Sequence, residues 1–177
     1  MRKMIKGEEK KRALWAKVLK SRSQIGIPYI FFTDNVSKGM PESYMRQGME
    51  VLASNLCSEI ALPSTEDESF VCDLSSMNAS KFEEWEETDA VETLTYFLDT
   101  VMSEFIEKSA KIEGLEKANR FAYRHRALGI GVLGFHDLLQ SKDIPFDDLE
   151  AYTWNSRVFK HIYDKTAEAS EKLAEEY

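Results

Sequence analysis

This chain has few cysteines, no long apolar run and no excess of basic residues, and each of these features excludes a class of protein. Two cysteines in 177 residues are too few for a disulfide framework. No apolar run approaches the roughly 18 residues that a membrane span needs, so we expect no membrane partner. The 31 acidic residues outnumber the 23 Lys and Arg and give a net charge of −8. That balance argues against nucleic acid as a partner and indicates a solvated acidic surface.

The N-terminus and the composition point to the cytoplasm. Residues 1–11 are charged and no apolar stretch follows them, so they do not form a secretory signal. We therefore expect a reducing compartment, in which Cys57 and Cys72 are both thiols at rest. The chain is 43% apolar and 31% charged, which is typical of a soluble protein. Its length suits one domain or a piece of a larger one.

Hydrophobic periodicity predicts a mixed α/β fold. The clearest helix runs from about Thr88 to Ile112, with Thr88 as its N-cap and Gly114 as its C-terminal stop. Its apolar stripe consists of Val91, Leu94, Leu98, Val101, Phe105 and Ile112. Further helices are predicted at 8–25, through 135–139, and from 146 or 147 to the end. Strands are predicted at 29–33, 70–74 and 127–132, and strands separated by helices imply an α/β arrangement.

The segment Ser-Asn-Leu-Cys-Ser-Glu-Ile at 54–60 places three different chemical groups at alternating positions. If the segment is extended, Asn55, Cys57 and Glu59 face one side together. An amide orients a ligand, a thiol does redox or radical chemistry, and a carboxylate moves protons. Two polar groups flanking a buried thiol need partners or they cost stability, and a functional site supplies those partners. The sequence therefore predicts a catalytic array here.

A glycine motif at 129–134 matches the G-x-G-x-x-G pattern of dinucleotide-binding proteins. That fingerprint also requires a preceding apolar strand and an acidic residue after a second strand, about twenty residues on. The residues at 123–127 are mostly charged instead, and helices follow the motif. We therefore expect these glycines to let a strand and a helix pack closely, rather than to bind a nicotinamide cofactor.

The histidines and cysteines of the chain are not spaced as the ligands of known metal sites are. His125, His136 and His161 share no ligand spacing and sit beside charged neighbours, so surface histidines are expected. The sequence holds no Glu-x-x-His pair for a di-iron bundle, and the two cysteines are not spaced as C-x-x-C. We predict no metal site in this chain. For Cys72 a buried, small hydrophobic role stays open as the alternative to chemistry.

Three motifs, in order along nearly the whole chain, resemble one enzyme family. The run Ser-Asn-Leu-Cys-Ser-Glu-Ile-Ala-Leu-Pro at 54–63 is similar to the radical-bearing finger loop of the large (catalytic) subunit of class I ribonucleotide reductase. Val-Cys-Asp-Leu-Ser-Ser-Met-Asn at 71–78 is similar to its strand with a redox cysteine, and 126–134 to a further barrel signature. The resemblance implies a helix-rich fragment of a ten-stranded α/β barrel. Residues 1–177 would form a single partial domain, with the finger loop at about 48–62.

The family's chemistry assigns roles to four residues. A thiyl radical on Cys57 would take the 3′ hydrogen of a ribonucleotide, since S–H and that C–H bond have similar strengths. Glu59 would act as general base on the 3′ hydroxyl, and Asn55 would hydrogen-bond the ribose and hold it against the thiol. Asn55 and Glu59 would thus also bind substrate. Cys72 would be half of the dithiol that reduces the 2′ position, although its partner cysteine is absent from the chain.

The resemblance also implies partners. The chain itself would bind no cofactor, because a di-iron or dimanganese small subunit supplies the radical and thioredoxin or glutaredoxin the electrons. The substrate-phosphate loops are missing, so we expect activity only with the remaining large-subunit segments, in a homodimer of the assembled large subunit. The alternatives are a non-catalytic helical interaction module, an inactive truncated fragment, or the related cobalamin-dependent class.

Overall fold

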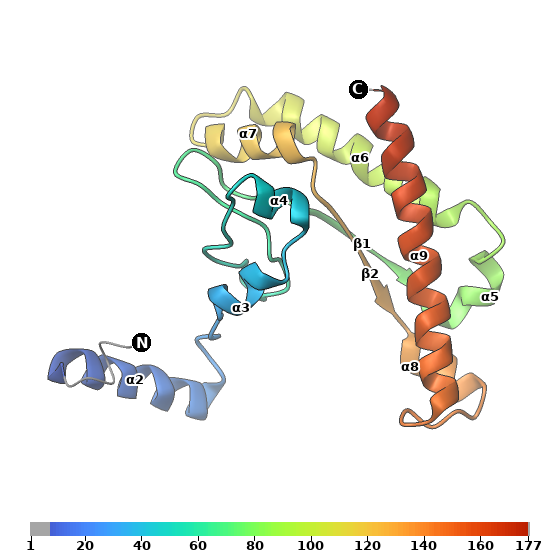
Figure 1. Ribbon diagram of the computed structural model, residues 1–177, viewed down its shortest axis with the longest axis horizontal. Helices are drawn as coiled ribbons and strands as arrows, with labels where there is room; N and C mark the ends of the chain where they lie inside the picture. The colour runs from blue at the N-terminus through green and yellow to red at the C-terminus, as the bar shows by residue number, and fades with distance from the viewer. Residues whose placement is uncertain (1–7, 177) are drawn as a thin grey trace. The chain divides into compact units, whose positions relative to one another are not determined.

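The computed structural model describes residues 8–176 and divides between Thr65 and Glu66 into two compact units. The first unit contains three helices, α2 (Glu9–Ile25), α3 (Thr33–Lys38) and α4 (Glu42–Arg46), joined by irregular chain (Figure 1). The predicted first helix is confirmed as α2. It ends because Gly26 takes the left-handed conformation and donates its backbone N–H to the carbonyl of Arg22, a common C-terminal cap. The prediction of one partial domain concerns the assembled barrel and stays a prediction.

The buried strand predicted at 29–33 is wrong. Tyr29 and Phe32 are exposed, the backbone there is irregular, and Thr33 already begins α3. A strand needs hydrogen bonds from a neighbouring strand, and none is assigned between residues 8 and 65. Residues 29–33 therefore have the aromatic and β-branched composition of a strand, but the first unit offers them no described strand to pair with.

The second unit is built on two parallel strands, β1 (Asp73–Asn78) and β2 (Leu128–Leu133), which pair from Asp73 with Leu128 to Asn78 with Leu133. Parallel neighbours need a long crossover. Here it consists of η1 (Ala79–Lys81), α5 (Phe82–Trp85), α6 (Ala90–Ser109) and α7 (Glu116–His125). After β2 come α8 (Phe135–Ser141) and the long α9 (Leu149–Glu176). The predicted α/β class is confirmed (Figure 1).

Most predicted elements of this unit exist with shifted ends. The predicted central helix is α6, and the hydroxyl of Thr88 accepts a hydrogen bond from the Ala90 N–H at 3.3 Å, although Asp89 occupies the cap position. The last helix begins at Leu149, where the Asp148 carboxylate accepts the Glu150 N–H at 2.8 Å. The strand predicted at 70–74 begins only at residue 73. The helix α7 was not predicted, because its sequence is dominated by charged residues.

One face of the sheet builds the core and the other is open. Side chains alternate along a strand, and Met77, Ile130 and Val132 point to the side where α5, α6, α8 and α9 pack. Those strand residues contact a cluster of Phe82, Trp85, Val91, Leu138, Val158 and Ile162. The opposite side, here called the open face, carries Cys72, Leu74, Ser76, Asn78, Gly129, Gly131 and Leu133. Leu74 and Leu133 are 53% and 52% exposed there, so the helices of the second unit do not cover this face.

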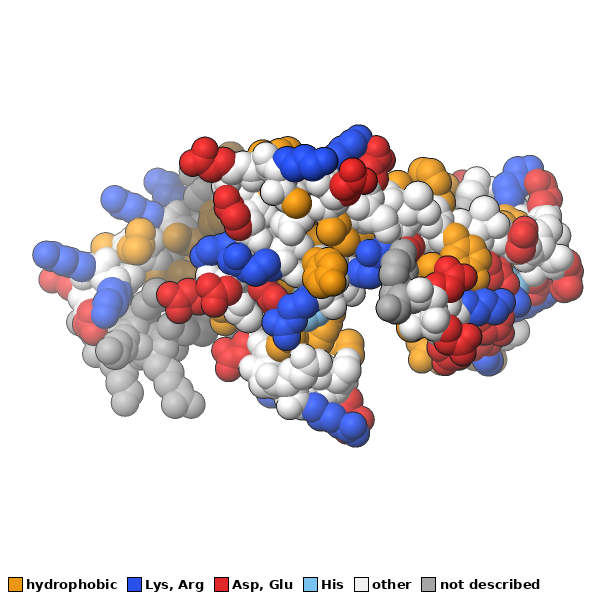
Figure 2. All heavy atoms as spheres, turned by 90° about the horizontal axis from the view of Figure 1, so that it is seen from above, with side chains coloured by type: hydrophobic (Ala, Val, Ile, Leu, Met, Phe, Trp, Pro, Cys, Tyr) orange, Lys and Arg blue, Asp and Glu red, His pale blue; other side chains and the backbone are white. Residues whose placement is uncertain are grey.

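The glycine motif lies mostly inside β2. Gly129 and Gly131 are strand residues, and only Gly134 belongs to the turn that leads into α8. A dinucleotide fingerprint instead places its glycines in the turn between strand and helix. On the surface drawn in Figure 2, acidic and basic side chains are intermixed, as expected of a solvated surface.

Candidate active site

The segment 54–60 forms a tight turn, so its predicted extended conformation is wrong. The Ser58 N–H donates to the carbonyl of Asn55 at 3.1 Å, and Ser58 has a left-handed φ of 66°. A non-glycine residue with positive φ interrupts the two-residue alternation on which the prediction rested. Leu56 is 90% exposed and Cys57 is also exposed. The thiol therefore lies at the tip of a loop.

The side chain of Asn55 closes this loop from inside. Its Nδ2 donates to Oε1 of Glu59 at 2.5 Å, and its Oδ1 accepts the backbone N–H of Ile60 at 3.1 Å. Ser54 adds a bond from Oγ to the Ile60 carbonyl at 2.6 Å. The turn thus brings together the amide and the carboxylate that were predicted to cooperate, with Cys57 between them in the chain. Local hydrogen bonds, rather than strand alternation, produce this arrangement.

A groove of about 530 Å³ borders the loop within the first unit. Its walls are mainly apolar, with a few hydroxyl and amide groups from Thr33, Ser54, Asn55 and Ser58. Apolar walls with a few oriented polar groups are typical of small-molecule sites. The apolar wall residues are Ile27, Pro28, Tyr29, Phe31, Leu52, Ala53 and Leu56. Sequence reasoning missed this groove, since it joins two segments about 25 residues apart.

Cys72 is half-buried and directly precedes β1. Its Sγ lies 3.6 Å from the carbonyl oxygen of Asp73 and borders Gly129 on the open face. Within the second unit, Cys72 thus lies at the rim of the open face rather than among core side chains. Both cysteines of the chain are thiols.

A basic stripe on α7 holds the segment that leads to Cys72. Lys117 donates to the carbonyl of Glu66 at 2.5 Å, and Arg120 donates twice to the carbonyl of Asp67, at 3.0 and 2.8 Å. One turn later, Arg124 pairs with the buried carboxylate of Glu68 at 3.0 Å. Lys117, Arg120 and Arg124 share one helical face through their spacing of three and four residues. That spacing is the signal by which the sequence could have revealed this contact.

The prediction of surface histidines is correct only for His136, which is exposed. The side chain of His125 is 8% exposed, stacks on Phe121 with ring centroids 4.4 Å apart, and lies 3.4 Å from Glu68. His161 is half-buried and its Nε2 is fully covered. Both rings lie on the buried faces of their helices. The prediction failed because it relied on the charged residues next to each histidine in the sequence, which do not show which face of a helix is buried. Within residues 8–176, no three metal-ligating side chains converge on one point.

Arg126 ties β2 to α6. It adopts a left-handed φ of 42°, and its guanidinium donates to the Asp99 carboxylate at 2.8 Å, the Asp99 carbonyl at 2.9 Å and the Ser103 hydroxyl at 2.5 Å. The Asp99 side chain is 7% exposed, so the ion pair is largely buried. This contact is also absent from the sequence prediction.

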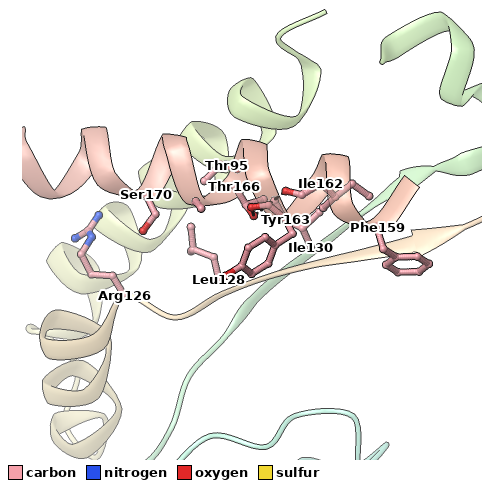
Figure 3. Close-up of a pocket in the computed structure, with 10 residues that line it drawn as sticks. Thr95, Arg126, Leu128, Ile130, Phe159, Ile162, Tyr163, Thr166 and Ser170 are labelled. Atoms are coloured by element: carbon pink, nitrogen blue, oxygen red, sulfur yellow. Dashed lines mark hydrogen bonds between the residues drawn. The ribbon is translucent and has the colours of Figure 1, made fainter. Parts of the chain in front are cut away.

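A second cavity, of about 630 Å³, lies between β2, α6 and α9 (Figure 3). Leu128 and Ile130 of β2 form one wall, and Arg126 lies at one end. The wall from α9 consists of Phe159, Ile162, Tyr163, Thr166, Ala167 and Ser170. Among the described residues β2 has one neighbouring strand, so this mostly apolar hollow is space that further protein can fill.

Charge and burial perturb two carboxyl groups of the second unit. Burial raises the pKa of Asp73, whose Oδ2 is covered and has no hydrogen-bond partner. For Glu92, burial opposes ionisation, but the hydrogen bond and charge of Lys165, 3.0 Å away, outweigh it and lower the pKa. Both groups lie on the helix-covered side of the unit, away from the Cys57 loop in sequence. No helix among the described residues is long and apolar enough to cross a bilayer.

Comparison with known proteins places this geometry in one family. Residues 2–177 match the family model described as ribonucleotide reductase, barrel domain. A relative from frog virus 3 (isolate Goorha) is 37% identical over 166 residues, which cover 93% of this chain and 29% of that protein. The ribonucleoside-diphosphate reductase large subunit of Invertebrate iridescent virus 3 is 35% identical, over 97% of this chain and 27% of that protein.

A solved structure agrees with these relatives. The Actinobacillus ureae class Id ribonucleotide reductase alpha subunit superposes with a TM-score of 0.87 at 54% identity, over 99% of this chain and 34% of that chain. The chain thus spans about a third or less of the proteins that it matches. The sequence match, the fold and the three ordered motifs agree, and the chain belongs to the ribonucleotide reductase barrel-domain family.

Proposed function

We propose that this chain supplies the finger loop and one redox strand of a ribonucleoside-diphosphate reductase large subunit, which converts ribonucleotides to deoxyribonucleotides. One observation carries the proposal: Asn55 and Glu59 are hydrogen-bonded to each other at 2.5 Å in a turn whose tip exposes Cys57. The family match over residues 2–177 gives this turn its chemical context.

Each group of the turn has a step to perform. A thiyl radical on Cys57 takes the 3′ hydrogen atom of the ribose and becomes a thiol, leaving the radical on the sugar carbon. Glu59 accepts the proton of the 3′ hydroxyl, which needs an ionised carboxylate within hydrogen-bond reach. Asn55 holds the sugar against the thiol, because an oriented reactant loses less entropy in the transition state. The bond between Asn55 and Glu59 holds both groups in one orientation before substrate arrives.

Reduction of the ribose consumes two electrons, which two cysteine thiols supply together, and Cys72 is one of these two thiols. Two thiols become a disulfide as the 2′ hydroxyl leaves as water, so Cys72 requires a second cysteine from another segment. Thioredoxin or glutaredoxin then returns the disulfide to thiols by exchange. The position of Cys72 at an open sheet face supports this role, since exchange requires access to the sulfur.

The chain works with complementing protein. The sheet within the described residues has two strands, so each strand keeps one unpaired edge, and barrels abolish such edges by adding strands. The 630 Å³ cavity beside β2 is further space for that protein. We propose that the remaining large-subunit segments pair with these edges and that the assembled subunit forms a homodimer in the cytoplasm.

The radical source is a separate subunit. We propose a di-iron or dimanganese small subunit as its carrier, with no cofactor bound by this chain. The likeness to a class Id alpha subunit supports this source over the cobalamin-dependent class.

Reconstitution tests the proposal. The 177-residue chain is assayed for ribonucleoside diphosphate reduction alone, and then together with the missing large-subunit segments and the small subunit. We expect turnover only in the full mixture, and its loss on Cys57→Ser. The matched control is Ser43→Ala on α4, an exposed residue of the same unit, which should leave turnover unchanged. Turnover by the chain alone contradicts the complementation, and an active Cys57→Ser mixture contradicts the radical role.

A further inference from the structure

The residue of β2 that borders the Cys72 thiol is a glycine, Gly129. A Cβ built on Gly129 would lie 3.3 Å from Sγ of Cys72 and 2.4 Å from Cδ2 of Leu74. Both distances are tighter than ordinary van der Waals contact, and the second would force Leu74 to move. The backbone of β2 therefore approaches the thiol as closely as a glycine allows.

Packing in the core does not explain this glycine. The covered face of β2 carries Leu128, Ile130 and Val132, two of which join the core cluster, whereas Gly129 faces the open side. Glycine within a strand costs stability, because it loses more backbone freedom on folding and offers no side chain to pack. Its φ is not positive, so no unusual backbone conformation requires it. The remaining reason is the close approach of two side chains of the segment 72–74: Leu74, whose Cδ2 is nearest at 2.4 Å, and Cys72, whose Sγ lies 3.3 Å away.

We propose that Gly129 is a positioning residue for Cys72: it keeps the space beside the thiol clear, so that the sulfur can reach a second sulfur over the open face. This inference rests on the redox role proposed for Cys72, and adds that the space around its Sγ must stay free for a second sulfur. Gly131 serves a different neighbour, because a Cβ there would meet Ser76 Oγ at 3.1 Å and no sulfur.

The chemistry needs that clearance. In exchange, the Cys72 thiolate attacks one sulfur of a disulfide, the new S–S bond forms as the old one breaks, and the departing thiolate takes up a proton. The incoming sulfur, its substituent and the departing sulfur all have to fit around Sγ. A methyl group 3.3 Å from Sγ occupies part of that volume and restricts rotation about the Cα–Cβ bond of Cys72.

The test compares Gly129→Ala with wild type in the full chain, with glutathione disulfide as the probe. Mass spectrometry follows the mixed disulfide at Cys72 and, as an internal control, at Cys57. We expect exchange at Cys72 to slow about tenfold, as a modest overpacking cost implies, and exchange at Cys57 to stay unchanged. Gly131→Ala is the matched control and should leave the Cys72 rate within about twofold. Equal rates at Cys72 in Gly129→Ala and wild type, or equal slowing by Gly131→Ala, overturn the proposal.

A second variant guards against a folding defect or an indirect effect through Leu74. Leu74→Ala combined with Gly129→Ala removes the closest contact of the new methyl group, and it is compared with Leu74→Ala alone. We expect the tenfold slowing to persist in that pair; if it disappears, displaced Leu74 is the cause and the proposal fails. Nucleotide reduction is not measured here, so failure leaves the proposed function standing. Conversely, full activity of Cys72→Ser in the reconstituted enzyme would defeat the redox role without changing the measured clearance.

Discussion

The amide of Asn55 donates to the carboxylate of Glu59, four positions further along the chain, at 2.5 Å. The same amide oxygen accepts the Ile60 N–H, so Asn55 both shapes the loop and orients the acid. An acceptor that is already hydrogen-bonded keeps its position when substrate binds, which lowers the entropic cost of the reaction. The loop geometry and the proposed proton transfer therefore depend on the same bond.

Glu59→Gln separates those two functions. A glutamine oxygen still accepts the hydrogen bond from Asn55, so the turn should keep its conformation, but it cannot take a proton from a hydroxyl. We expect turnover of the reconstituted enzyme to fall by about 10²–10⁴-fold, the usual contribution of a general base. Steady-state kinetics measure the loss, and Glu50→Gln, an exposed acid outside the hydrogen-bonded turn at 54–60, serves as the matched control. Undiminished turnover of Glu59→Gln would assign the base elsewhere.

The buried pair of Asp99 and Arg126 makes a separate prediction about stability. Asp99→Asn leaves the Arg126 guanidinium largely buried without its counter-charge, and breaking such a pair costs about 3 kcal/mol. Denaturant unfolding of the chain should show this loss. Asp164→Asn disrupts the exposed pair with Lys160 instead and should cost less than about 1 kcal/mol. If both variants lose the same free energy of unfolding, burial does not govern the Asp99 pair.

The sequence predicted those elements whose cause is local and missed those that depend on a neighbour. The helices α6 and α9 follow from their own apolar stripes, and β2 from a short apolar run between charged and polar segments. Residues 29–33 have strand composition but lack a pairing partner in their unit, so composition alone was misleading. The helix α7 was not predicted because the residues that share its contact face are basic rather than apolar. They donate hydrogen bonds to the backbone of Glu66 and Asp67, about 50 residues away in the sequence.

At the candidate site the sequence suggests which residues to consider but does not reveal their geometry. The proposed set of Asn55, Cys57 and Glu59 rests on residue types and a family resemblance, neither of which depends on backbone conformation. The left-handed Ser58 then folds the segment into a turn, which no two-residue pattern reveals. The clearance at Gly129 required the register of β1 against β2, a relation between residues 57 positions apart.

The partly buried carboxyl of Asp73 gives the chain a pH dependence of a predictable sign. Its pKa is raised above the ordinary 3.8 by burial, so the folded state holds its proton more tightly than the unfolded state. The destabilisation is therefore absent below pH 3.8, grows as pH rises through the folded pKa, and is complete above it. Asp73→Asn should raise the melting temperature at pH 7, and the gain should vanish in acid. Thermal unfolding at several pH values checks this, and a gain that is independent of pH would contradict it.

Gly134, between β2 and α8, is a position where the backbone conformation itself favours glycine. Its φ is 72°, and a Cβ there would meet Asn78 Oδ1 at 2.3 Å, the atom that accepts the Ser80 N–H at 3.1 Å. Gly134→Ala thus adds left-handed strain and displaces the side chain that caps η1, so we expect a loss of about 1–3 kcal/mol. Gly39→Ala is the matched control, since Gly39 has a negative φ of −95° and the nearest atom to its Cβ position is 3.5 Å away. Chemical denaturation of both variants measures the difference, and equal stability of Gly134→Ala and wild type would mean that the turn relaxes without cost.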